Sequence, residues 1–271
     1  MIETLATTIE NTESMPGYRL LTLEYDEEVS VGPGQFAMLR AHRIPEPLLR
    51  RALAVYRAES TTRLTFLYQV LGRGTEVLAT LHPGDKVESL APLGNKWPMP
   101  SSGRAAVVAG GIGSASVFML VQDLLRGGIE TQVFFGAASR QAAFGSGLSD
   151  FAALGLPLTI TTDDGSFGEP GRVTAPLERY LRSTRAGAVA IYACGPWAMM
   201  ARAAEISAAV GARCLVSLEA PMGCGFGVCV GCVFAVKSDG PPGFGSYKRV
   251  CVDGSIFPAS IVDWQINAMA H

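Results

Sequence analysis

Charged residues are scarce in this sequence. They make up 17% of its 271 residues, whereas an average soluble domain has roughly 25%. The 22 Lys and Arg nearly balance the 24 Asp and Glu, and the formal charge of -2 argues against a basic field of the kind that binds nucleic acid. The positive mean hydropathy of +0.26 indicates apolar surface that a buried cofactor or a partner subunit would cover.

Heptad repeats and periodic glycine are also missing, which excludes a coiled coil and a collagen-like chain. Residues 105–122 carry no charge, but glycines and serines interrupt them, so we expect a strand, a glycine turn and a helix rather than a membrane span. The N-terminal residues include Glu3 and Glu10 and lack the apolar core of a signal peptide. We therefore expect a cytoplasmic protein without a membrane or nucleic-acid partner, whose six cysteines stay reduced or bind metal.

The first 100 residues show a period-two pattern. Short alternating segments are separated by turn residues, which is typical of an antiparallel barrel. These segments are residues 19–23, 35–39, 53–56 and 64–70. Residues 75–81 are compatible with one short helix, and the prolines within residues 92–102 indicate a linker. We place a domain boundary near residue 101.

Beyond this boundary, apolar strands alternate with helical stretches. We expect strands at residues 105–109, 131–135, 157–161, 188–193 and 214–218, and helices at residues 114–126, 173–182 and 196–210, with a loop after the second strand. Continuous apolar strands between helices predict a parallel sheet buried on both faces. From Pro221 onward the sequence is irregular and rich in glycine and cysteine. The fold class is therefore β barrel plus α/β, with a barrel at 1–101, an α/β domain at 102–215 and a C-terminal module at 216–271.

Four cysteines have the sharpest spacing in the chain. They are Cys224, Cys229, Cys232 and Cys251. The first three follow the pattern C-x4-C-x2-C, which together with a distant fourth cysteine is typical of a plant-type 2Fe-2S cluster. A zinc site prefers two C-x2-C pairs, which the four-residue gap breaks, and reduced core cysteines are the other alternative. Cys194 and Cys214 lie outside the pattern and are not expected as ligands.

Three turns follow predicted strands of the second half. They contain Gly110, Gly111 and Gly113; Asp164; and Cys194, Gly195 and Pro196. All three turns would lie at the carboxyl ends of parallel strands, where open sheets bind ligands. Glycines before a helix let backbone amides approach a diphosphate. The glycine motif alone is weak, because Ser116 replaces its third glycine, and a plain tight turn is the alternative.

Two segments of the first half have the residue types of a flavin dinucleotide site. Arg50 and Arg51 precede a small, apolar strand edge, and residues 68–71 lead into a glycine turn before the predicted helix. A fixed cation and a glycine turn would bind a diphosphate. A solvated arginine pair beside an ordinary strand turn is the alternative from residue types alone.

In this order, the motifs resemble those of one family. The sequence is similar to the electron-transfer subunits of the two-subunit, NAD-dependent (class 1B) dihydroorotate dehydrogenases, which belong to the ferredoxin reductase superfamily. The similarity covers essentially the whole chain and rests on the segments YQVLGRGTEVL, LAPLGNKW, AGGIG, TTDDGSFGEPGRVT, YACGPWAMM, VSLEAPMGCGFGVCVGC and YKRVCVDGSIF. The resemblance implies FAD in the barrel, NAD on the parallel sheet and a 2Fe-2S cluster in the C-terminal module.

The resemblance also implies site residues, with one departure. The family's flavin motif R-P-x-S falls on Arg51, Ala52, Leu53 and Ala54. The serine hydroxyl expected near flavin N5 is therefore missing. FAD would be held by Arg51, Leu67, Tyr68, Gln69, Gly74 and Thr75, and the nicotinamide nucleotide by the three turns described above. Ser139 and Arg140 follow the second strand, where they are compatible with an adenosine 2'-phosphate, so only the resemblance favours NAD over NADP.

The resemblance implies a redox relay between NAD(H), FAD and the cluster. Its expected partner is a separate FMN-containing dihydroorotate dehydrogenase catalytic subunit of pyrimidine biosynthesis, in a heterotetramer. One alternative is the electron-transfer subunit of another complex, of the ferredoxin NADP oxidoreductase or sulfhydrogenase type. The other is a flavin and iron-sulfur redox sensor without turnover.

Overall fold

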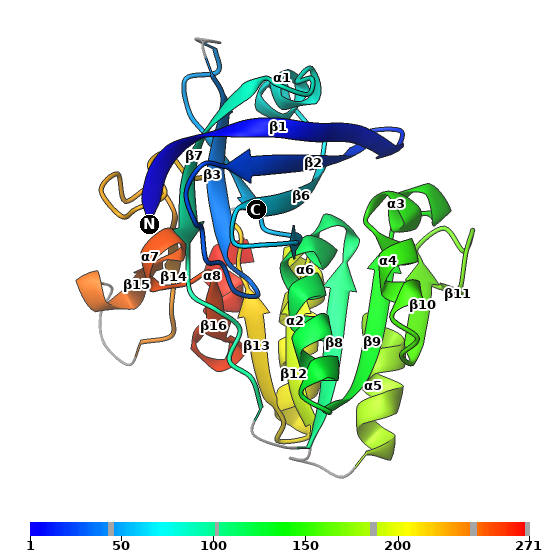
Figure 1. Ribbon diagram of the computed structural model, residues 1–271. Helices are drawn as coiled ribbons and strands as arrows, with labels where there is room; N and C mark the ends of the chain where they lie inside the picture. Colours follow the sequence, from blue (N-terminus) through cyan, green and yellow to red (C-terminus); the bar gives the residue numbers. More distant parts are fainter. Residues whose placement is uncertain (43–45, 101–102, 185–188, 239–242, 269–271) are drawn as a thin grey trace.

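The computed structural model describes residues 1–42, 46–100, 103–184, 189–238 and 243–268. Two seven-stranded sheets form most of the structure. The first uses residues before 94 and the second uses residues after 103, and Figure 1 shows them one above the other, with the N-terminal sheet at the top. The predicted fold class, an antiparallel barrel-like part followed by an α/β part, is confirmed.

The first sheet is antiparallel throughout. Its spatial order is β4 (Arg51–Ala54), β3 (Phe36–Ala41), β7 (Lys86–Leu93), β1 (Ile2–Met15), β2 (Tyr18–Tyr25), β6 (Arg63–Gln69) and β5 (Arg57–Ala58). The period-two pattern reflects alternate burial, since Leu21, Leu23 and Tyr25 of β2 all lie in the core. Helix α1 (Arg73–Ala79) adds Leu78 to the same core.

The second sheet is parallel except at one edge. Its spatial order is β11 (Glu169–Pro170), β10 (Leu158–Thr162), β9 (Glu130–Ala137), β8 (Arg104–Gly110), β12 (Val189–Cys194), β13 (Arg213–Ser217) and β16 (Ile256–Pro258). Only β16 runs antiparallel to its neighbour. Because β16 comes from the predicted C-terminal module, that module is joined to the sheet rather than tethered beside it.

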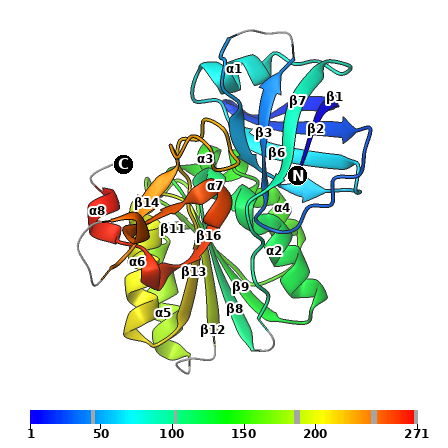
Figure 2. The ribbon, with the colours of Figure 1, turned by 90° about the vertical axis from the view of Figure 1, so that its left-hand side faces the viewer.

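Helices cover both faces of the second sheet. Helices α2 (Ser114–Arg126) and α4 (Leu148–Ala153) lie on one face, and α5 (Thr174–Ser183) and α6 (Trp197–Ala209) lie on the other, as Figure 2 shows. Successive residues of β8 therefore enter two different cores: Val107 packs with α2, whereas Val108 packs with α5 and α6. This double burial is the physical reason for the continuous apolar strands in the sequence.

The prediction of a loop after the second strand is wrong. This segment forms α3 (Arg140–Gly145) and α4. Ser139 caps α3 by accepting a hydrogen bond from the Ala142 amide, and Gly147 separates the two helices with a positive φ. Both helices have only six residues, which is too short for a clear apolar periodicity.

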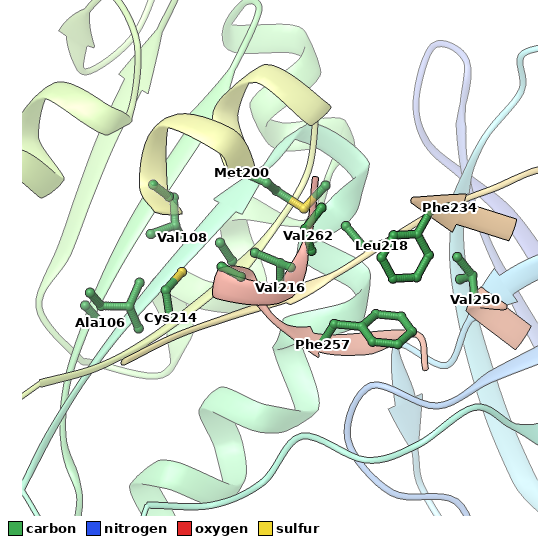
Figure 3. Close-up of a cluster of buried hydrophobic side chains, with 14 of the residues drawn as sticks. Ala106, Val108, Met200, Cys214, Val216, Leu218, Phe234, Val250, Phe257 and Val262 are labelled. Atoms are coloured by element: carbon green, nitrogen blue, oxygen red, sulfur yellow. The ribbon is translucent and has the colours of Figure 1, made fainter. Parts of the chain in front are cut away.

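The C-terminal part is a small module with a two-stranded antiparallel sheet. Its elements are β14 (Val233–Ala235), η2 (Phe244–Ser246), β15 (Tyr247–Arg249), α7 (Val250–Asp253), η3 (Ala259–Ile261) and α8 (Trp264–Ala268). Figure 3 shows Phe234 and Phe257 packed beside Val216 and Leu218, next to the second sheet. One hydrophobic cluster therefore spans the module and the sheet, which holds the two parts together.

The connection between the two sheets is firmly attached to the rest of the structure. The Asn95 side chain exchanges two 2.9 Å hydrogen bonds with the backbone of Ile256. Trp97 donates from its backbone to Pro33 and from its ring to the carbonyl of Ser116. The predicted boundary at residue 101 lies outside the described residues. Among the described residues, no helix is long and apolar enough to cross a membrane.

Candidate functional site

A larger cavity of about 840 Å³ opens at the carboxyl ends of the parallel strands. Five of the predicted nicotinamide-site residues line it: Gly110, Gly111, Gly113, Gly195 and Pro196. They come from the ends of β8 and β12, with the short helix η1 (Gly111–Gly113) between β8 and α2. The structure therefore brings these two turns together, as expected where neighbouring parallel strands end.

Glycine is needed at these turns because their backbones touch. A Cβ on Gly113 would lie 2.6 Å from the Cys194 carbonyl, and a Cβ on Gly195 would lie 2.7 Å from the Gly110 Cα. Gly111 has a φ of +51° and open space where a side chain would be. The backbone just before α2 is thus exposed to the cavity, as an anionic diphosphate requires.

Two predicted nicotinamide-site residues do not line this cavity. The carboxylate of Asp164 accepts hydrogen bonds from the amide and hydroxyl of Ser166, which lowers its pKa, and Asp163 takes the place on the cavity wall. Cys194 is buried beside Ser116 and Ser217, and burial together with the nearby Glu219 charge raises the pKa of its thiol. Cys194 therefore lies behind the wall that Gly195 and Pro196 form.

Polar groups without a protein partner face the same cavity. Thr161 is buried and lines the cavity, yet its hydroxyl has no hydrogen-bond partner. An orphaned buried hydroxyl costs free energy unless a ligand or water satisfies it. Arg172 lines the cavity too and forms no ion pair among the described residues. These groups fit the polar, anionic parts of a dinucleotide.

A smaller cavity of about 440 Å³ lies between the two sheets. Seven of the predicted flavin-site residues line it: Ala52, Leu53, Ala54, Leu67, Tyr68, Gln69 and Thr75. The opposite wall carries three serines whose hydroxyls lie in a row, with Ser116 Oγ 3.1 Å from Ser217 Oγ and the latter 3.4 Å from Ser255 Oγ. The apolar strand edge on one side and the hydroxyls on the other fit a flat, polar-edged ring.

The remaining two flavin-site residues lie against each other. A Cβ on Gly74 would be 1.9 Å from the Arg51 Nε, so the guanidinium occupies the space that any side chain at position 74 would need. Arg51 and Gly74 border a separate small hollow beside α1 instead of the smaller cavity. The Arg51 guanidinium lies on a glycine turn with no side chain in the way, and this arrangement fits a phosphate of FAD.

The cysteine loop brings its sulfur atoms together in pairs. The Cys232 and Cys251 sulfurs are 3.2 Å apart, and the Cys229 amide donates to the Cys224 sulfur over 3.4 Å. In the described part of the chain, no three Cys, His, Asp or Glu side chains gather as around a single ion. A 2Fe-2S cluster instead takes four cysteines, two on each iron. The paired arrangement fits that donor set.

The thiols are in different electrostatic surroundings. Burial raises the pKa of Cys224, but backbone amides of the loop outweigh it and bring this pKa to about 6. Burial and the adjacent Cys232 thiol raise the pKa of Cys251. The loop also forces Val230 to a φ of +56°, an uncommon value for a β-branched residue. Amides directed at sulfur stabilise thiolates, the form that binds iron.

Comparisons with known proteins agree with this geometry. Residues 219–263 match the iron-sulfur cluster binding domain of dihydroorotate dehydrogenase B. The chain also superimposes on a chain of the NADH-dependent reduced ferredoxin-NADP oxidoreductase with a TM-score of 0.84, at 24% identity over 98% of this chain and 92% of that one. The protein therefore has a reductase fold of the ferredoxin reductase type that carries an iron-sulfur domain.

Sequence relatives identify the family. The chain is 35% identical over 235 residues to the electron transfer subunit of dihydroorotate dehydrogenase B (NAD(+)) from Desulforamulus reducens, covering 86% of this chain and 87% of the relative. It is 37% identical to the same subunit of Geobacillus thermodenitrificans over 85% and 86%. The chain belongs to this family of electron-transfer subunits, as its motifs predict, and is an oxidoreductase subunit.

Sequence reasoning missed three features of the site. The sequence pattern indicates Asp164, but its neighbour Asp163 is the residue that lines the cavity. The row of serine hydroxyls joins positions that are 101 and 38 residues apart, so only the fold reveals it. Glu219 lines both cavities. Its position directly after a predicted parallel strand was the available signal.

Proposed function

We propose that this chain carries electrons between NAD(H) and a separate catalytic subunit, by way of FAD in the smaller cavity and a 2Fe-2S cluster in the cysteine loop. The observation that supports this proposal best is that the three candidate sites lie next to one another, in the order larger cavity, smaller cavity and cysteine loop. The two cavities share Gln69, Ile112 and Glu219. The wall of the smaller cavity continues through Pro221 and Met222 directly into the cysteine loop.

The larger cavity would bind the dinucleotide. The backbone before α2 would neutralise the diphosphate, because amides at a helix start carry partial positive charge. Arg172 would add a cation, and the free hydroxyl of Thr161 would hydrogen-bond a polar group of the ligand. Pro196 and Gly195 shape the cavity wall in front of the buried Cys194.

The smaller cavity would hold the flavin ring, and Arg51 over Gly74 would bind a phosphate. FAD, when bound, accepts two electrons as a hydride and returns them singly, which an iron-sulfur cluster requires. The cysteine loop packs close to this cavity, since a Cβ on Gly225 would lie 2.6 Å from Met38 of β3. Phe36 of the same strand lines the cavity. Short separation favours electron transfer without movement of the module.

The names of the relatives imply a separate catalytic subunit. We assign this role to an FMN-containing dihydroorotate dehydrogenase subunit, in a heterotetramer, because the relatives are named as electron-transfer subunits of that enzyme and match most of this chain. The residue assignments and the cytoplasmic location stay predictions.

The test is anaerobic titration of the purified chain with NADH, followed by addition of the dihydroorotate dehydrogenase catalytic subunit and orotate. We expect bleaching of the flavin absorbance, an EPR signal from the reduced cluster, and orotate reduction only when both chains are present. Unchanged spectra with NADH would favour a redox sensor. Reduction without transfer to this partner would favour an electron-transfer subunit of another complex, such as a ferredoxin NADP oxidoreductase.

A further inference from the structure

Glu219 stands where the two cavities meet. It follows β13 by two residues and lines both cavities, together with Gln69 from the end of β6 and Ile112 from η1. Of these three shared residues, Glu219 alone carries a charge. Under the proposed function, this junction is where the reacting ring of the dinucleotide meets the flavin.

The carboxyl group of Glu219 has no partner of its own. Among the described residues, it makes no ion pair and no side-chain hydrogen bond, and it is the only carboxylate that lines both cavities. Its side chain is exposed to water in the open cavities, and the protein atoms around it raise its pKa by partial desolvation. An unpaired carboxylate in such surroundings favours a cationic ligand.

The surrounding ionisable groups do not neutralise it. The larger cavity is also lined by Tyr18, Asp163, Arg172 and Arg202, the smaller cavity by Tyr68, and the Cys194 thiol lies behind the wall. Arg202 is occupied by Glu178 and Glu205. Arg172 stands at the start of α5, among the residues that follow β9 and β10, while Glu219 follows β13 on the other side of β8 and β12. The junction therefore has a negative field.

We propose that the Glu219 carboxylate makes the larger cavity prefer the cationic nicotinamide ring of NAD⁺ over the neutral ring of NADH. This inference rests on the proposed function, because it requires the dinucleotide to bind in the larger cavity. Both redox forms share the adenosine and the diphosphate, so contacts to those parts cancel in the ratio of the two affinities. Only a charge close to the ring distinguishes the two forms.

The preference depends on pH in a defined direction. A cation beside a carboxylate favours its ionised form, so bound NAD⁺ lowers the Glu219 pKa and its binding releases protons near that pKa. As pH falls through the raised pKa of free Glu219, the carboxyl becomes neutral and the preference disappears. The neutral ring has no such dependence.

The experiment uses the full chain loaded with FAD and cluster. NAD⁺ and its tetrahydronicotinamide analogue, whose ring is neutral and transfers no hydride, are titrated by calorimetry. For Glu219→Gln we expect the Kd for NAD⁺ to rise about tenfold and that of the analogue to change less than about twofold, as expected for one charge at partial solvent screening. Glu219→Asp, which keeps the charge, should preserve most of the preference. In the wild type, the preference should shrink as the pH is lowered through the raised pKa of Glu219.

Asp163→Asn is the matched control, because it removes one carboxylate from the larger cavity away from the junction. It should leave the ratio of the two Kd values unchanged. An unchanged ratio in Glu219→Gln, or an equal change in both Kd values, overturns the inference and leaves the proposed function intact. A wild type that binds neither compound contradicts the nicotinamide site itself.

Discussion

Ala54 puts a methyl group on the wall of the smaller cavity, where the family motif has a hydroxyl. The serines on the opposite wall are a compensating source of hydroxyl groups, but they already bond to one another and to the carbonyl of Gly34. A hydroxyl at position 54 would be new on the strand side of the cavity.

Restoring this hydroxyl tests its importance. In Ala54→Ser we expect the rate of flavin reduction by NADH to rise about fivefold, the effect of one added hydrogen bond of about 1 kcal/mol in the transition state. Stopped-flow absorbance measures this rate. Ala58→Ser, on the exposed edge strand β5, adds a hydroxyl outside both cavities and should match the wild type. An unchanged or lower rate in Ala54→Ser would show that the missing hydroxyl at position 54 does not limit flavin reduction by NADH.

The cysteines separate into ligands and core residues. Replacing any one of Cys224, Cys229, Cys232 and Cys251 with serine should abolish or strongly reduce the visible absorbance of the cluster and its EPR signal, because a hard hydroxyl is a poor ligand for iron. Cys214→Ser is the control, since Cys214 is buried in the hydrophobic cluster of the second sheet. Purification of the wild type with about one zinc and no iron or sulfide would contradict the cluster assignment.

At the scale of elements, the fold was predictable where burial is uniform. The central parallel strands β8, β9 and β12 are buried on both faces, so their apolar runs mark them clearly. Strand β1 was missed because exposed residues alternate irregularly along it, and only Ala6 and Thr8 are buried. Its 14 residues are stabilised by pairing with β2 and β7, which are contacts that a local pattern does not record.

The candidate site was also predictable only where local sequence determines the structure. The cysteine loop was predictable because its ligands are close in sequence and their spacing carries the chemistry. The cavities were only partly predictable: glycine turns after parallel strands converge by topology, but whether a given side chain faces a cavity depends on local turns. Asp164 bonds within its own turn, and Cys194 packs behind the wall.

The turn between β8 and α2 allows a sharp test of the nicotinamide site. Gly111→Val would place a branched side chain in the open space before α2, in the expected path of the diphosphate. We expect the KM for NADH to rise at least about tenfold, with FAD and cluster content unchanged. Steady-state assays with an artificial electron acceptor measure the KM.

Gly128→Val controls for backbone strain in this test. Gly128 also has a positive φ, +69°, and open space at its Cβ, but it lies after α2, away from both cavities. Both variants should lose similar stability, since a side chain at positive φ costs roughly 1–2 kcal/mol. If both variants raised KM equally, strain rather than ligand contact would be the cause.

At the scale of the whole molecule, apolar side chains are exposed around the cysteine loop. Phe226, Val228, Val230 and Val252 are all exposed, and Val228 is 73% accessible. Val252 of α7 lies beside the loop, since a Cβ on Gly227 would be 2.6 Å from its Cγ2. Under the proposed function, electrons leave the chain at this loop, and an exposed apolar patch there is typical of an interaction surface.

This patch predicts where the catalytic subunit binds. Val228→Glu would place a carboxylate in the desolvated centre of that interface, and we expect the Kd for the dihydroorotate dehydrogenase catalytic subunit to rise at least about a hundredfold, because a buried unpaired charge costs several kcal/mol. Ile9→Glu, an equally large change on exposed β1, should bind the partner like the wild type.

The measurement is analytical ultracentrifugation of the mixed chains, with iron and flavin content checked for each variant. Because Val228 contributes only its backbone to the surroundings of the Cys224 sulfur, and the substitution keeps that backbone, both variants should keep the cluster. Tight partner binding by Val228→Glu together with weakened binding by Ile9→Glu would move the interface to the first sheet, and electrons would then have to leave the chain from the flavin rather than from the cluster.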